Sequence, residues 1–116
     1  TKLELADPKG AIPLLERSRE RLANVGTEIA LGNAWMESSD AIRAERAYRR
    51  ALAMHPGSFR GHANLAESLR VQGKLEEAGR HLALAKRLYP GHPKLPEIEE
   101  RLRRALRDRD QGESRP

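Results

Sequence analysis

Residues 47–69, AYRRALAMHPGSFRGHANLAESL, contain the feature that decides the fold: an alanine-rich helical pattern ends at Pro56, and a second helical pattern starts soon after it. The same ending returns in residues 81–93, HLALAKRLYPGHP, where Pro90 is again followed by a glycine. Proline has no backbone N–H and disrupts a helix interior, so both prolines mark helix ends. They are 34 positions apart, which indicates a repeated unit.

Shifting the chain by this period aligns residues of similar size. The matched pairs are Leu31 with Leu65, Gly32 with Ala66, Trp35 with Leu69, Ala44 with Ala78, Tyr48 with Leu82 and Ala51 with Ala85. Small residues allow two helices to approach closely, and large apolar residues fill the seam between them. Ser39, Asp40 and Gly73 suit the turn inside each unit. The period therefore predicts one antiparallel helix pair in residues 25–58 and another in residues 59–92.

These residues resemble the tetratricopeptide repeat, a helix–turn–helix unit of 34 residues. Its W-x2-L-G-x2-Y element is similar to the stretches that start at Glu28 and His62, which replace the leading aromatic residue. Its A-x3-F element is similar to the stretches that start at Ala44 and Ala78. The resemblance covers roughly residues 2–92. It implies an all-α fold, an α-solenoid of antiparallel helix pairs wound into a right-handed superhelix.

The flanking segments predict incomplete units. Residues 1–24 are similar to the end of a unit, with only Leu3 and Leu5 left from its first helix, and we expect the uncovered apolar surface to promote self-association through this end. Residues 93–109 predict a capping helix. Its apolar face consists of Leu95, Ile98, Leu102 and Leu106. Residues 110–116 are expected to form a disordered tail.

Residue patterns for catalysis or metal binding are sparse. The chain has no cysteine, and its four histidines lack the i, i+4 spacing of a helical metal site. His55 and His92 are expected to be solvated or to cap helices, and His62 is expected to pair with Glu28. We therefore predict that this segment is not an enzyme and requires neither a cofactor nor a metal.

Composition limits the compartment and the kind of partner. No apolar stretch approaches the ~20 residues of a membrane-spanning helix. A cysteine-free chain is compatible with the cytoplasm and does not exclude the periplasm. Arginine outnumbers lysine, which favours a bacterial source. The net charge of +5 permits an acidic partner. Nucleic acid is disfavoured, because Glu and Asp are interleaved with the arginines of the cap.

The resemblance implies a scaffold that binds an extended peptide or protein segment, acidic or of mixed charge, in the concave groove of the array. The matching groove positions are Asn33, Met36, Glu37, Arg60, Asn64, Glu67, Arg70 and Lys94. Some family members clamp a C-terminal carboxylate, and three of these residues, Asn33, Asn64 and Lys94, match clamp positions. Ile29 and Ile98 replace two of the clamp cations, so a more general groove is favoured.

An alternative from another class stays open. The chain could be an accessory repeat domain of an enzyme, such as a transferase or a sulfatase-type hydrolase, whose catalytic domain lies outside this segment.

Overall fold

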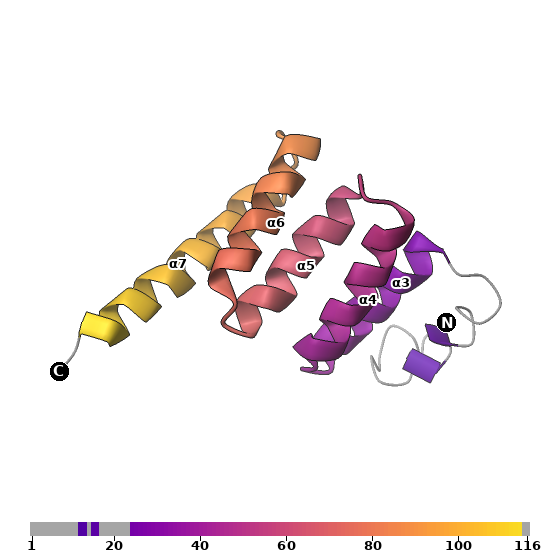
Figure 1. Cartoon of the computed structure of the whole chain (residues 1–116), viewed down its shortest axis with the longest axis horizontal. Coiled ribbons are helices and arrows are strands. Elements are labelled where there is room, and N and C mark those ends of the chain that lie inside the picture. Colours follow the sequence, from indigo (N-terminus) through magenta and orange to yellow (C-terminus); the bar gives the residue numbers. More distant parts are fainter. Residues whose placement is uncertain (1–11, 14, 17–23, 115–116) are drawn as a thin grey trace.

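The computed structural model describes residues 12–13, 15–16 and 24–114, and five helices follow Asn24 (Figure 1). They are α3 (Val25–Glu37), α4 (Ala41–Met54), α5 (Phe59–Val71), α6 (Leu75–Leu88) and α7 (Leu95–Ser114). No strand occurs among the described residues. The prediction of an all-α solenoid of antiparallel helix pairs is confirmed for this part of the chain.

The helices form two layers, and Figure 1 shows them side by side from α3 to α7. Each helix packs against the next one along the chain, and α5 also contacts α3 and α7. By contrast, the backbones of α4 and α6 do not approach each other closely among the described residues, and these two helices meet only through long side chains such as Arg49 and Glu77. Because α3, α5 and α7 contact one another in sequence, they form the inner layer of a curved array. The surface of this inner layer is therefore the concave one.

Short polar side chains fix the starts of three helices. Asn24 accepts a hydrogen bond from the Thr27 backbone N–H at 2.8 Å, and Asp40 accepts one from the Arg43 N–H at 3.0 Å. Ser58 caps α5 in the same way. Such bonds satisfy N–H groups that have no partner inside the helix. The turn before α6 instead uses Gly73, whose φ of 81° lies in the left-handed region that the sequence predicted for it.

The core is the seam between small and large residues that the period predicted. Ala44, Ala51, Ala78 and Ala85 are all 0% exposed, and the large residues beside them are buried as well. Tyr48 is 1% exposed and Leu82 is 6% exposed. Residues from α3 to α7 join in one apolar cluster, so the repeated units share a continuous core.

Helix α7 closes the C-terminal end of this core. Leu95, Ile98 and Leu102 are buried in the shared cluster, and Leu106 packs against it as a partly buried residue. The helix is longer than predicted, because it continues to Ser114. The expectation of a disordered tail is therefore wrong for residues 110–114. Arg109 forms a 2.5 Å ion pair with Glu76 of α6, which fixes this end of the helix to the array.

The expected partial unit in residues 1–24 falls mostly outside the described residues, and so does the self-association predicted for it. Of its apolar residues, Ile12 is 5% exposed and shares a small cluster with Leu31, Ala34 and Ala47 of the first helix pair. Ile12 thus packs against both helices of that pair.

Candidate functional site

Two adjoining pockets lie on the concave layer. The first, which we call the basic pocket, has a volume of about 350 Å³. It is lined by Asn33, Phe59, Arg60, Ala63, Asn64, His92, Lys94 and Ile98. The second, the acidic pocket, has a volume of about 260 Å³ and is lined by Asn33, Met36, Glu37, Tyr48, Asn64 and Glu67. The two pockets meet at Asn33 and Asn64, which line both.

The structure brings the predicted groove residues together. Asn33, Met36, Glu37, Arg60, Asn64, Glu67 and Lys94 all line one or both pockets. The eighth, Arg70, lines neither pocket but donates a 3.2 Å hydrogen bond to Glu67. Helices α3 and α5 supply six of the seven lining residues, and Lys94 immediately precedes α7. Residues far apart in the chain therefore form one continuous surface.

Asn33 and Asn64 form an amide pair where the pockets meet. Asn33 Oδ1 accepts a 2.6 Å hydrogen bond from the Tyr48 hydroxyl and a 3.2 Å hydrogen bond from Asn64 Nδ2. Burial raises the pKa of Tyr48, and the nearby Glu67 and Glu37 raise it further, so the phenol keeps its proton and remains a donor. Among the described residues, Asn33 Nδ2 and Asn64 Oδ1 have no hydrogen-bond partner. One donor and one acceptor thus face the groove.

The basic pocket combines an apolar floor with unpaired cations. Ala63 and Ile98 are 2% and 5% exposed and form part of the floor. Arg60 and Lys94 are exposed, and neither side chain forms an ion pair within the described part of the chain. No acidic residue lines this pocket. The site is therefore suited to an anionic group attached to an apolar side chain.

Aromatic rings shape the rim of the basic pocket. Phe59 stacks on His92 with ring centroids 4.1 Å apart, and Tyr89 packs edge-on against both rings. His92 Nδ1 accepts a 3.1 Å hydrogen bond from the Lys94 backbone N–H, a bond inside the turn that precedes α7. His55, which the sequence predicted with His92 to be solvated or to cap a helix, is exposed. The stack holds the turn before α7, and with it Lys94, next to α5.

The acidic pocket has the opposite charge. Glu37 is exposed and has no ion-pair partner among the described residues. Glu67 Oε2 accepts hydrogen bonds from Arg70 at 3.2 Å and from Arg101 at 3.0 Å. Glu67 Oε1 is buried and has no hydrogen-bond partner in this part of the structure. No cation lines the pocket.

Sequence reasoning missed three contributors to the groove. Arg101 lies 34 positions after Glu67, so the period itself could have indicated this contact between neighbouring units. Phe59 and His92 form the aromatic rim, but they lie at the two ends of the second unit, residues 59–92, and no short-range spacing brings them together. Their stacking depends on how α7 packs against α5.

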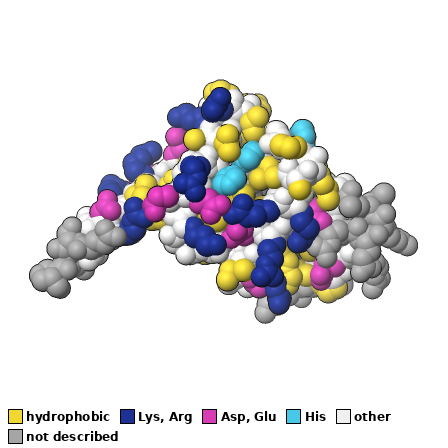
Figure 2. Space-filling model, viewed as in Figure 1, with side chains coloured by type: hydrophobic (Ala, Val, Ile, Leu, Met, Phe, Trp, Pro, Cys, Tyr) yellow, Lys and Arg dark blue, Asp and Glu magenta, His cyan; other side chains and the backbone are white. Residues whose placement is uncertain are grey.

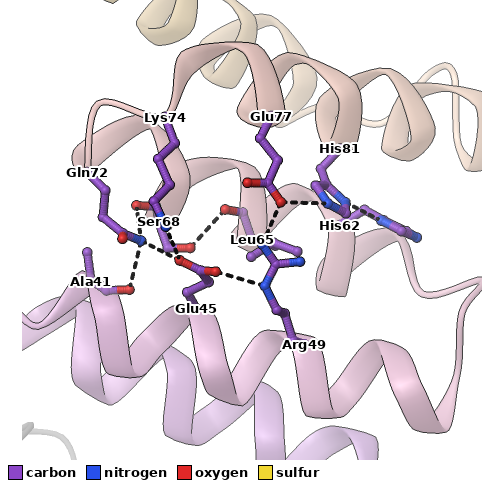
Figure 3. A network of polar contacts seen from close by, with 10 residues as sticks. All are labelled: Ala41, Glu45, Arg49, His62, Leu65, Ser68, Gln72, Lys74, Glu77 and His81. Carbon is purple, nitrogen blue, oxygen red and sulfur yellow. Dashed lines mark hydrogen bonds and ion pairs between the residues drawn. The ribbon is translucent and has the colours of Figure 1, made fainter.

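A second polar network lies away from the pockets and links α4, α5 and α6 (Figure 3). Arg49 bridges Glu45 at 2.8 Å and Glu77 at 2.5 Å. His62 and His81 approach each other with their Nδ1 atoms 3.1 Å apart. The expected pairing of His62 with Glu28 is wrong, because His62 Nε2 instead lies 2.8 Å from the Pro56 carbonyl oxygen. Glu28 instead forms a 2.9 Å ion pair with Arg50, which belongs to the same helix pair as Glu28.

The arginines of α7 are largely paired with glutamates. Arg101 contacts Glu97 at 2.5 Å, and Arg103 and Arg107 both contact Glu100. Figure 2 shows basic and acidic side chains interleaved along this helix on the face turned to the viewer, without a continuous basic stripe. This arrangement is typical of a solvated charged helix.

Neither a metal site nor a membrane span is found in the part of the chain that the structure describes. Its histidine, aspartate and glutamate residues do not gather in groups of three or more that could hold a metal ion. No described helix is both long enough and apolar enough to span a bilayer.

Comparison with protein-family models finds no match for this chain, and a search of curated proteins finds none. The geometry of the two pockets is therefore the basis for a functional assignment.

Proposed function

We propose that this chain is a scaffold that binds an extended peptide or protein segment along the concave layer of a tetratricopeptide-like array. The observation that carries the proposal is the pair of adjoining pockets lined by seven of the predicted groove residues. Their unpaired charges and open amide groups are suited to a polar chain more than to a compact apolar ligand. The resemblance to the tetratricopeptide repeat supports the same role.

The amide pair offers what an extended backbone needs. An extended peptide exposes both N–H donors and C=O acceptors along its length. Asn33 can donate through Nδ2, and Asn64 can accept through Oδ1, while the Tyr48 hydroxyl fixes the orientation of Asn33. A preorganised amide costs less side-chain entropy on binding than a free one does. The pockets on either side can then select the side chains.

The proposal can be tested by selecting random twelve-residue peptides on the wild-type chain and measuring their binding by fluorescence anisotropy. The double variant Arg60→Glu, Lys94→Glu should weaken the selected peptides by about tenfold or more, because it reverses both free cations of the basic pocket. The matched control is Arg80→Glu, Arg87→Glu, which reverses two exposed cations of α6 that line neither pocket. Failure to select any peptide, or equal losses in the two double variants, would contradict binding in the groove.

A further inference from the structure

The charges of the groove are segregated by pocket. The cations that line the basic pocket are Arg60 and Lys94, and the carboxylates that line the acidic pocket are Glu37 and Glu67. The uncharged amides of Asn33 and Asn64 separate the two groups. A ligand that occupies both pockets therefore meets opposite charges at its two ends.

Three of these four charges are available to a ligand. Arg60, Lys94 and Glu37 are exposed and unpaired within the described residues. Glu67 differs, because Arg70 and Arg101 occupy its Oε2. Its Oε1, however, is a buried acceptor without a partner. Because this oxygen is closed off from solvent, a ligand in the acidic pocket meets the charge of Glu67 without touching Oε1, and Glu37 is the carboxylate that a ligand contacts directly. Arg70 Nε is also buried and unbonded, but Arg70 does not line the pocket.

The spacing of the pockets can be estimated from one helix. Arg60 and Glu67 both lie on α5, seven residues apart. At about 1.5 Å per residue, this separates them by roughly 10 Å along the helix axis. An extended peptide advances about 3.3 Å per residue, so roughly three residues cover the same distance. The two pockets thus match side chains about three positions apart in a ligand.

We propose that the groove recognises an extended segment that carries a carboxylate and a cation about three residues apart, with the carboxylate in the basic pocket and the cation in the acidic pocket. This inference rests on the function proposed above and narrows it from charged segments in general to segments of mixed charge. A uniformly acidic segment would place a carboxylate against Glu37 and Glu67. A uniformly basic one would place a cation against Arg60 and Lys94. Both arrangements are repulsive.

The test uses four charge versions of one selected peptide, with the two charged positions three residues apart: acid–base, base–acid, acid–acid and base–base. At low salt, at least one mixed version should bind about tenfold more tightly than either like-charged version. The variant Glu37→Lys should reverse this preference toward the acid–acid peptide. Its control is Asp108→Lys, the same change of charge at an exposed site outside both pockets, which should leave the ranking unchanged.

The outcomes separate this inference from the function on which it rests. If all four versions bind equally well, or the acid–acid version binds best to the wild type, the mixed-charge inference is overturned, and binding in the groove stands. If Glu37→Lys leaves the order of the four peptide affinities unchanged, the acidic pocket does not contribute to the choice of ligand, and the inference fails as well. If none of the four peptides binds, the proposed function and the inference fail together.

Discussion

At the scale of single residues, Gly32 packs closely against the Tyr48 ring in the core. A Cβ atom added to Gly32 would lie 2.3 Å from Tyr48 Cε1 and 2.6 Å from two further ring atoms. The ring cannot easily move away, because it is 1% exposed and its hydroxyl is bonded to Asn33. One period later the equivalent residues are Ala66 and Leu82, a larger residue facing a smaller one. The two units therefore fill equivalent positions with different pairs of residues: glycine with tyrosine in the first unit, and alanine with leucine in the second.

The variant Gly32→Ala should unfold more easily than the wild type. Overpacking of a core typically costs about 1–3 kcal/mol, which outweighs the gain of up to about 1 kcal/mol from placing alanine in a helix. Adding Tyr48→Leu should restore part of the loss, because it recreates the Ala66–Leu82 pair of the next unit. Urea unfolding of the wild type, the two single variants and the double variant gives this coupling energy.

The control for this series is Gly79→Ala, the same change in helix α6. Its added Cβ would meet Leu102 Cδ2 at an ordinary distance of 3.8 Å, so we expect unchanged or slightly raised stability. If Gly32→Ala is as stable as Gly79→Ala, the contact with Tyr48 does not restrict this position.

At the scale of helices, the sequence predicted most of the fold because its signals repeat. The prolines and the small residues recur with the period, whereas the cap that Asp40 provides for α4 has no counterpart at Lys74 of α6, where Gly73 makes the turn instead. The end of α7 was missed because Arg109 is held by Glu76, a side chain on another helix. The groove positions came from the resemblance to a repeat family, whereas the pairing of Glu67 with Arg101 and the stacking of Phe59 on His92 depend on how α7 and the turn before it pack against α5.

A histidine pair joins α5 to α6 by a hydrogen bond that depends on protonation (Figure 3). The Pro56 carbonyl can only accept, so His62 Nε2 carries a proton. In neutral His62, Nδ1 then accepts a hydrogen bond from His81 Nδ1, which leaves His81 Nε2 facing the Glu77 carboxylate at 4.0 Å. Burial lowers the pKa of His81, and the nearby His62 and Arg49 lower it further, while Glu77 opposes them.

Stability should therefore fall as the pH is lowered from about 7.5 to 5.5. The unfolded chain takes up a proton at His81 near the ordinary histidine pKa of about 6.5, whereas the folded chain takes it up only at lower pH, so acid favours unfolding. Glu45 and Glu77 stay ionised in this window, because hydrogen bonds from Arg49 help to lower the pKa of each. In His81→Gln the fall should be smaller, as thermal unfolding across the pH range can measure. His55→Gln, at an exposed site, should keep the wild-type slope; a slope that is the same in all three proteins would exclude His81 as its source.

At the scale of the whole molecule, α5 occupies the central place. It contacts α3, α4, α6 and α7, whereas α7 contacts only α5 and α6 among the described helices. In a linear array each unit is stabilised mainly by its neighbours, so the position of a defect decides how far its effect spreads. Two leucines allow this to be tested, because Leu65 of α5 and Leu95 of α7 are 0% and 2% exposed. They differ in position far more than in burial.

Leu65→Ala and Leu95→Ala should each lower the free energy of unfolding of the surrounding structure by about 2–5 kcal/mol. The two variants should differ in how many helices are affected. In Leu65→Ala we expect faster amide hydrogen exchange in all five helices, since α5 connects them. In Leu95→Ala the increase should be concentrated in α7, which can detach while the two helix pairs stay folded. Leu84→Ala, at a site that is 40% exposed on α6, is the control and should change little. Equal acceleration of every helix in both core variants would show that the array unfolds as one unit and that α7 has no independent stability. Exchange confined to α7 in Leu95→Ala would instead show that the pockets lose Lys94 and the aromatic rim before the rest of the groove opens.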